Sequence, residues 1–350
     1  MYWGRKTIAL SLACVLLGLA GLWFGQAWLQ TVIPQNENEP TDPEILGVHD
    51  SFVRSLAYSP TGEYLASCGG QELRLWKVID NQCVTKQLDS PESPCFTHDG
   101  KFLVSGAYDK TIRTWHVPSL DLESTITVDG VLHGVSQIAL SPDERFVAAA
   151  MGPSGWIVSV FDRQTQKNVL QLAGHTKDVF SVAYSANGKL LLTASIDHTV
   201  RIWDTRTGNP LEVLNDHSEP VMKCVAAKNA DIAASSDVGG NIILWDLSKR
   251  TSKTVLSNPR SAINDMTFSP CGKYLAIAIS PLGADTRGGV ILFDVRTSER
   301  IATVHPHSGN TGGVTCVAFA PDGKTIATAG TDDRAIKIHD FAKFLSQTEH

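Results

Sequence analysis

Three residues that lie near one another in the sequence have the types of a nucleophilic triad: His175, Thr193 and Asp197. In such a triad the histidine accepts the proton of a hydroxyl group and the carboxylate orients the imidazole. His305 and His307 could offer two imidazoles to a metal ion, but no third ligand follows at a suitable spacing. The sequence also contains no GxxxxGKS/T, GxSxG, HExxH or CxxC motif. The role of these side chains therefore depends on the elements that position them.

Composition excludes several classes of protein. The chain has 350 residues, of which 43% are hydrophobic and 19% charged, so it is neither disordered nor collagen-like. A chain of this length suggests about two domains. The formal net charge of -6 gives no basic surface for nucleic acid, so no nucleic-acid partner is expected. Seven cysteines are too few for a disulfide scaffold.

A long uncharged segment near the N-terminus predicts a membrane anchor. Residues 7–33 contain no charged side chain. As a helix they would be about 40 Å long, against a hydrocarbon core of about 30 Å. Trp23 and Trp28 lie near the far end, where aromatic rings favour the membrane interface. We therefore expect a hydrophobic helix within residues 1–33, followed by a linker over 34–43.

The same segment has two other interpretations. Gly25-Gln26-Ala27 would permit cleavage of a secretory signal near Ala27. However, the apolar stretch 8–24 is longer than the usual hydrophobic region of a signal, which has about 7–15 residues. The third interpretation is a buried helix of a soluble protein. We favour the retained anchor, with the cleaved and secreted protein as the alternative.

Charges on either side of the segment predict its orientation. Arg5 and Lys6 precede it, whereas residues 34–44 carry only acidic charges. The positive-inside rule then leaves the N-terminus in the cytoplasm and the rest of this single-pass protein outside it. Because the sequence has no Asn-x-Ser/Thr site for glycosylation, a bacterial envelope is favoured over a eukaryotic lumen.

The remainder of the chain is repetitive. Residues 175–204 contain three alternating runs separated by turn residues, which predicts three β-strands. The residue that ends the first run has an equivalent at intervals of 38, 44, 44, 42, 42 and 51 residues. These positions are Tyr58, Phe96, Leu140, Tyr184, Ala226, Phe268 and Phe319. A period near 40 residues indicates a repeat architecture.

The repeats resemble those of the WD40 family. The dipeptides that open and close such a repeat are matched at Gly174-His175, Trp203-Asp204 and Trp245-Asp246. The resemblance implies an all-β, seven-bladed WD40-type propeller over residues 44–345, preceded by the N-terminal hydrophobic helix and followed by a tail over 346–350. It also implies that residues 43–49 supply the fourth strand of the last blade and so close the ring.

The resemblance gives the apparent triad a structural role. In this family a His, a Ser or Thr, an Asp and a Trp of one blade form a buried hydrogen-bonded network. The fourth repeat carries all four, namely His175, Thr193, Asp197 and Trp203. The fifth is expected to lack the Asp because Gly239 stands at that position. The third, sixth and seventh are expected to depend on apolar packing. No catalytic residue, cofactor or metal ion is therefore expected.

Loops that depart from the repeat pattern are candidates for binding a partner. The third repeat has a longer turn that ends at Trp156, and the sixth and seventh carry insertions at 280–289 and 305–313. By analogy with the family these loops emerge on one face. The candidate partner-binding residues are Trp156, Asp285, Arg287, His305 and His307.

These features favour a membrane-anchored, non-enzymatic scaffold that presents one face of the propeller to partner proteins or peptides. The alternative is a secreted propeller that binds a small ligand or catalyses a reaction at its central channel. That function would require charged or histidine clusters at the channel mouth, and the repeat positions show none. A scaffold facing the cytoplasm on a reversed anchor is disfavoured by the charge asymmetry.

Overall fold

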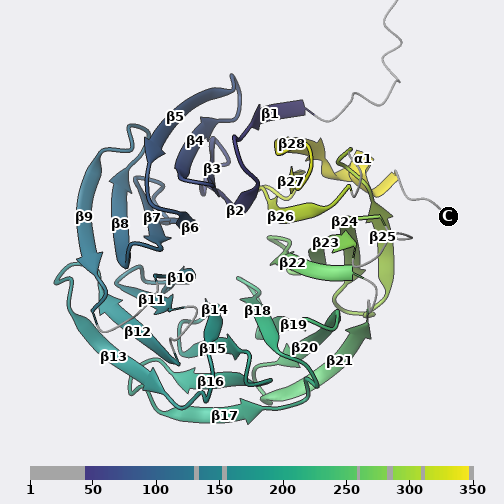
Figure 1. Ribbon diagram of the computed structural model, residues 1–350. Helices are drawn as coiled ribbons and strands as arrows, with labels where there is room; N and C mark the ends of the chain where they lie inside the picture. Colours follow the sequence, from purple (N-terminus) through teal and green to yellow (C-terminus); the bar gives the residue numbers. More distant parts are fainter. Residues whose placement is uncertain are drawn as a thin grey trace, which may run out of the picture. The chain divides into compact units, whose positions relative to one another are not determined.

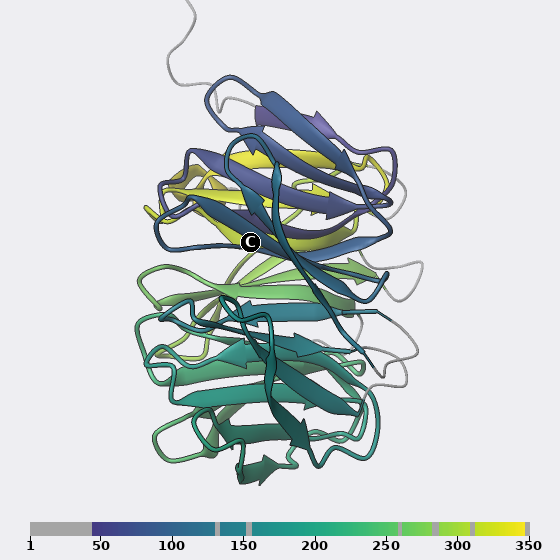
Figure 2. The same cartoon turned by 90° about the vertical axis from the view of Figure 1, so that its left-hand side faces the viewer.

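The computed structural model describes residues 44–129, 134–151, 156–257, 261–281, 287–308 and 312–346. Within them the chain forms seven four-stranded antiparallel sheets, arranged as blades around a central axis (Figure 1). Seen from the side, the strands run across the thickness of a disc (Figure 2). The prediction of an all-β, seven-bladed propeller is confirmed.

The expected membrane anchor and linker fall on residues 1–43, which lie outside the described part of the chain. Among the residues that are described, no helix is long and apolar enough to cross a membrane. The N-terminal hydrophobic helix therefore stays a prediction.

Six blades are each built from four strands that follow one another in the sequence, from the innermost to the outermost. Blades one to three consist of β2 (Val53–Tyr58), β3 (Tyr64–Gly69), β4 (Glu72–Lys77) and β5 (Gln82–Gln87); β6 (Pro91–Phe96), β7 (Phe102–Ala107), β8 (Thr111–His116) and β9 (Leu122–Thr127); and β10 (Gln137–Leu140), β11 (Phe146–Ala150), β12 (Ile157–Asp162) and β13 (Asn168–Ala173).

Blades four to six consist of β14 (Val179–Tyr184), β15 (Leu190–Ser195), β16 (Val200–Asp204) and β17 (Pro210–Leu214); β18 (Val221–Ala226), β19 (Ile232–Asp237), β20 (Asn241–Asp246) and β21 (Thr251–Ser257); and β22 (Ser261–Phe268), β23 (Tyr274–Pro281), β24 (Gly289–Asp294) and β25 (Arg300–Val304). Every position that set the repeat period in the sequence is the last residue of an innermost strand, from Tyr58 in β2 to Phe319 in blade seven.

The seventh blade is completed by a strand from the other end of the propeller sequence. It consists of β26 (Val314–Phe319), β27 (Thr325–Gly330), β28 (Ala335–Asp340) and β1 (Glu44–Val48). β1 pairs antiparallel with β28, with a bulge between Ile45 and Gly47. The predicted closure of the ring is confirmed, and it removes the free edge that β28 would otherwise expose.

The hydrophobic core lies between neighbouring blades. Side chains of a strand alternate between its two faces, so each sheet can pack apolar residues against the sheets on both sides. Leu244 of blade five, for example, belongs to the same buried cluster as Ile277 and Ile291 of blade six. Apolar burial of this kind holds adjacent blades at a fixed spacing and makes the faces of the disc rigid.

A short helix, α1 (Phe341–Ser346), follows β28 where the sequence predicted the end of a strand and a tail. Asp340 accepts a hydrogen bond from the Lys343 amide at 2.9 Å and so caps its first turn. Phe341 and Phe344 are buried, and the Phe344 ring lies 5.1 Å from the ring of His339. Six residues are too few to show a helical period, so the sequence pattern did not reveal this element.

The antiparallel order of each blade distributes its connections over two faces. The connection between the second and third strands, and the one that leads to the next blade, lie on one face, here called the upper face. The connections between the first and second and between the third and fourth strands lie on the lower face. β1 is an outermost strand that leads to the upper face, so the described chain enters the propeller at the lower face, with Glu44.

Candidate functional site

The four network residues of blade four are in contact. His175 Nε2 lies 2.7 Å from Thr193 Oγ1, and its Nδ1 lies 2.9 Å from Asp197 Oδ2. Trp203 Nε1 donates to the same Thr193 oxygen at 2.9 Å. Thr193 has no exposed surface, and its hydroxyl is shared between a histidine and an indole. The group therefore has the connectivity of a triad but no access for a substrate, and it ties the strands of the blade together.

The carboxylate of this network is held in its ionised form. Burial alone would raise the pKa of Asp197, but hydrogen bonds from His175, Thr199 and the Thr176 amide hold it well below its usual value. The ionised carboxylate can accept all of these donors at once.

Blade five contains the same network, contrary to the expectation from sequence. His217 Nδ1 lies 2.9 Å from Asp237 Oδ2, and its Nε2 lies 2.7 Å from Ser235 Oγ. Trp245 Nε1 donates to Ser235 Oγ at 2.7 Å. The assignment of Gly239 to the Asp position was wrong because the carboxylate comes from the last residue of β19, before the turn, and not from within the turn as in blade four.

Blade seven also contains the network, with a histidine in place of the tryptophan. His307 Nδ1 lies 2.9 Å from Asp333 Oδ2 and its Nε2 lies 2.8 Å from Thr328 Oγ1, which is 2.9 Å from His339 Nε2. His307, which was expected to bind a partner, is buried, and both of its ring nitrogens are engaged within the blade. The insertion in this repeat lies after His307, which displaced it from the position where the repeat pattern places the network histidine.

Blade one has an incomplete version. His49 Nε2 and Trp76 Nε1 each lie 2.7 Å from Ser67 Oγ. No carboxylate bonds to Nδ1 of His49, and the nearest one, Glu72 Oε2, is 3.7 Å away. Burial and the nearby Arg74 lower the pKa of His49 to about 4, so this imidazole is neutral at pH 7.

The innermost strands carry charge, which the repeat positions did not predict. Arg54 of β2 forms an ion pair with Glu92 of β6 at 2.7 Å, and Lys223 of β18 pairs with Asp265 of β22 at 3.2 Å. Burial alone would lower the pKa of Lys223, but the Asp265 carboxylate raises it, so the amine stays protonated at neutral pH. Each pair joins adjacent blades, and the two charges of each pair neutralise one another.

The described ends of the loops of blades six and seven meet on the upper face as expected. A Cβ on Gly288 would lie 2.3 Å from Cα of Gly313, so the two backbones are in direct contact. His305 Nδ1 lies 2.6 Å from the Gly288 carbonyl oxygen, and this histidine is half-buried. Arg287 is exposed. Asp285 lies outside the described residues.

Large apolar side chains are exposed on the upper face of blades one to five. The exposed fraction is 54% for Trp156, 49% for Phe52, 48% for Val238 and 38% for Tyr108. Together with the half-buried Ile196 we call these residues the apolar arc. Phe52 leads into blade one, and the others follow the second strands of blades two to five. Single exposed apolar residues are ordinary, but a set on one face indicates an interaction surface.

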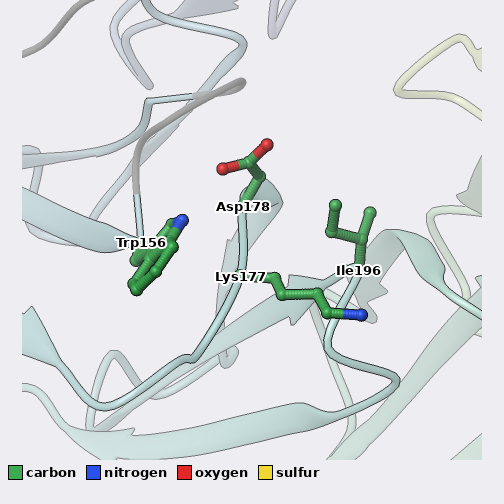
Figure 3. A pocket seen from close by; sticks show the side chains of 4 residues that line it. All are labelled: Trp156, Lys177, Asp178 and Ile196. Atoms are coloured by element: carbon green, nitrogen blue, oxygen red, sulfur yellow. The ribbon is translucent and has the colours of Figure 1, made fainter.

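Trp156 lines an open hollow of about 400 Å³ between blades three and four (Figure 3). Ile196 forms the opposite side, and Lys177 and Asp178 come from the connection between the two blades. In Figure 3 the Lys177 side chain extends toward Ile196, and the Asp178 carboxylate points away from the lysine ammonium. The hollow thus offers an indole, an aliphatic side chain and separated charges to a ligand.

Aromatic residues and Arg54 form a second part of this surface. The Arg54 guanidinium carbon lies 5.6 Å from the ring centroid of Phe52 and 6.0 Å from that of Tyr108. These contacts, together with the ion pair to Glu92, fix the guanidinium between blades one and two. Trp156 was predicted from the length of its loop, whereas Phe52, Tyr108 and Val238 were not, because each stands in a segment of ordinary length. The available signal was a large apolar side chain in an otherwise polar turn.

Side chains that could ligate a metal ion are dispersed among the described residues. Among the described residues, no group of three or more His, Cys, Asp or Glu side chains is placed to hold a metal ion. Every cysteine in the described part of the chain is a free thiol, and Cys68, Cys224 and Cys316 are buried. Burial raises the pKa of Cys224 to about 12, so this thiol stays protonated.

Seven four-stranded blades closed by a strand from the other end of the sequence define a β-propeller. The repeat profile described as "WD40: WD domain, G-beta repeat" matches residues 43–77, 90–116, 166–204 and 298–340. The protein is therefore a seven-bladed propeller that carries WD40 repeats.

Several curated proteins are similar to this chain. "Target of rapamycin complex subunit wat1" of Schizosaccharomyces pombe is 27% identical over 236 residues, which cover 66% of this chain and 71% of the relative. "Protein LST8 homolog" of Drosophila pseudoobscura pseudoobscura is 25% identical over 258 residues, covering 70% of this chain and 78% of the relative. "Pre-mRNA-processing factor 19 homolog 2" of Arabidopsis thaliana is 31% identical over 199 residues, which cover 53% of this chain and 36% of the relative.

Proposed function

We propose that this protein is a non-enzymatic scaffold that binds partner proteins through the upper face of its propeller. The observation that carries the proposal is the apolar arc, because large side chains such as Trp156 and Tyr108 remain exposed there on a rigid scaffold. Aromatic residues of this kind dominate the binding energy of protein interfaces. On the lower face the exposed large apolar side chains are Ile79 and residues at the beginning of outermost strands, such as Leu122 and Ile45, and none of the described ones is aromatic.

The relatives support the class of function. One of them is named as a subunit of the target of rapamycin complex, so it acts as a component of a protein assembly. The buried hydrogen-bonded networks support the non-enzymatic part of the proposal, because their hydroxyl groups are enclosed and engaged.

Attachment to a membrane is the second part of the proposal. It rests on the absence of charge over residues 7–33 and on the basic residues that precede them. The charge asymmetry favours an extracytoplasmic propeller, with secretion after cleavage near Ala27 as the alternative. The described chain enters the propeller at the lower face, opposite to the proposed binding face.

A site-specific crosslinking experiment tests the binding face. A photo-reactive amino acid is placed at position 156 in one variant and at position 79, on the lower face, in a matched control. We expect covalent adducts with partner proteins from position 156 and none from position 79. Equal adducts from both positions, or none from position 156, would contradict a binding face on the upper surface.

Alkaline-carbonate extraction tests the membrane attachment. Membranes from cells that make the C-terminally tagged protein are extracted, and the mass of the tagged protein is measured. Full-length protein in the membrane pellet is the expected result. A soluble product about 27 residues shorter would mean that the segment is a cleaved signal. Soluble protein of full length would contradict both alternatives.

A further inference from the structure

The connections between blades on the upper face carry a consistent charge. From the connection that enters blade one to the connection that enters blade five, each contains an acidic residue: Asp50, Asp89, Asp129, Asp178, Asp216 and Glu219. Among the described residues of these five connections, Lys177 is the one lysine or arginine. Asp89, Asp129 and Asp216 are exposed. These five connections therefore carry a net negative charge.

The acidic residues alternate around the ring with the apolar arc. Asp178 lines the hollow between Trp156 and Ile196. A Cβ on Gly239, next to Val238, would lie 3.2 Å from Cγ of Glu219. Each apolar side chain of the arc therefore lies next to a connection between blades that carries a carboxylate. The one arginine that contacts the aromatic residues, Arg54, is already paired with Glu92 and does not offset the carboxylates of the connections.

We propose that the upper face of blades one to five binds a basic protein segment in which lysine or arginine residues alternate with apolar side chains. The inference rests on the proposed function, because it specifies the partner of the same face. Apolar side chains of the segment contact the arc, and its cations lie near the carboxylates of the connections. A cation that enters the hollow contacts the Trp156 indole and approaches Asp178.

Electrostatics distinguishes this partner from an acidic one. A like-charged segment would bring its carboxylates next to Asp89, Asp129 and Asp216 while its apolar side chains contacted the arc, and such juxtapositions oppose binding. Attraction between exposed charges is screened by salt, because the Debye length shortens from about 30 Å at 0.01 M to about 3 Å at 1 M. Binding of a basic segment should therefore weaken as the salt concentration rises.

Peptide binding to the full-length protein in neutral phosphatidylcholine nanodiscs tests the inference. The probe is a fluorescent peptide of sequence KLKAKLKAKL, and its counterpart carries glutamate in place of each lysine. We expect the lysine peptide to bind at least about tenfold more tightly than the glutamate peptide, as charge complementarity at an interface allows. Its Kd is expected to rise about tenfold between 50 mM and 500 mM salt. Fluorescence anisotropy measures both.

Two charge-reversal variants separate a local effect from net charge. The first replaces Asp89, Asp129 and Asp216 by lysine. The control replaces Asp121, Asp231 and Glu299, which are exposed on the lower face, by lysine. Both variants change the net charge equally. We expect the first to weaken binding of the lysine peptide about tenfold, the size of effect that lost charge pairs give at interfaces, and the control to leave it unchanged.

The apolar contribution is tested by Trp156→Ala, with Ile79→Ala on the lower face as its control. Trp156→Ala should weaken binding of the lysine peptide and Ile79→Ala should not. If both peptides bind equally and both lose affinity in Trp156→Ala, the upper face binds partners but the basic partner is ruled out. If neither peptide binds, or if both charge-reversal variants weaken binding of the lysine peptide to the same extent, the inference is overturned. The crosslinking experiment at position 156 tests the proposed function independently of these outcomes.

Discussion

His307 Nδ1 lies 2.9 Å from Asp333 Oδ2, although the two residues belong to different connections of the upper face. His307 precedes β26, and Asp333 stands between β27 and β28. The other nitrogen of the same imidazole bonds to Thr328 within β27. A single buried side chain therefore fixes the long connection into blade seven against the blade itself.

Replacing His307 by alanine is expected to destabilise the propeller. The substitution removes the His307 hydrogen bonds to Asp333 and Thr328, and each lost bond costs about 0.5–1.5 kcal/mol. Lys337 still pairs with Asp333 and His339 still bonds Thr328. Urea unfolding followed by far-UV circular dichroism measures the change in the free energy of unfolding. His305→Ala is the matched control, because His305 is half-buried and bonds one backbone carbonyl. A loss as large in the control would contradict the structural role of His307.

The network of blade five predicts a strong coupling between His217 and Asp237. A double-mutant cycle with both alanine substitutions should give a coupling energy of about 0.5–3 kcal/mol, as expected for residues in one hydrogen-bonded network. A second double-mutant cycle, with His217 and Asp216, is the control, because Asp216 is adjacent in sequence but exposed. Additive effects for His217 and Asp237 would show that Asp237 is not the network carboxylate.

The sequence predicted the blades because their period is imposed by the fold. Every innermost strand must end in a comparable place, so the positions from Tyr58 to Phe319 could be found by spacing alone. The network was predicted less well. Its residues are fixed in space but not in sequence. The carboxylate can come two residues earlier, from the strand before the turn, as at Asp237, or an insertion can follow the histidine, as at His307.

The apolar arc was largely missed for a different reason. Insertions draw attention to a loop, which is how Trp156 was identified, whereas Phe52, Tyr108 and Val238 occupy turns of ordinary length. Their common face follows only from the ring. Residues far apart in the sequence become neighbours on the surface because successive blades repeat the same turn around one axis (Figure 1).

Histidine in the tryptophan position of blade seven predicts a loss of stability in mild acid. Burial, with contributions from His307 and Lys337, lowers the pKa of His339 from 6.5 to about 3. As the pH falls, His339 is therefore protonated in the unfolded chain before it is protonated in the folded protein. The stability that the neutral His339 contributes is complete above pH 6.5 and is lost as the pH falls toward 3. Urea unfolding at pH 7, 5.5 and 4.5 measures the decline.

His339→Gln is the matched variant, since glutamine can still donate a hydrogen bond to Thr328 but does not titrate. Other groups, including His49, titrate in both proteins and cancel in the comparison. We expect the free energy of unfolding to fall less in the variant than in the parent between pH 7 and 4.5. If the free energy of unfolding falls equally with pH in the variant and the parent, His339 is not the group that causes the loss of stability.

Closure of the ring predicts that two truncations differing by β1 behave differently. A chain beginning at residue 44 retains β1, and a chain beginning at residue 49 loses it. Without β1 the edge of β28 is exposed, and free strand edges pair with other chains. The shorter chain should melt at a lower temperature and form oligomers, whereas the longer one should stay monodisperse. Thermal unfolding and size-exclusion chromatography with light scattering measure both.

A point substitution tests the same closure without removing the strand. A Cβ on Gly47 would lie 2.3 Å from ring atoms of Trp76, the indole that bonds Ser67 in blade one. Gly47→Val should therefore separate β1 from blade one and lower the melting temperature, because overpacking of a well-packed core costs about 1–3 kcal/mol. Ile45→Val, at an exposed position of the same strand, is the control and should change little. If both variants melt like the parent, β1 does not join blade seven to blade one.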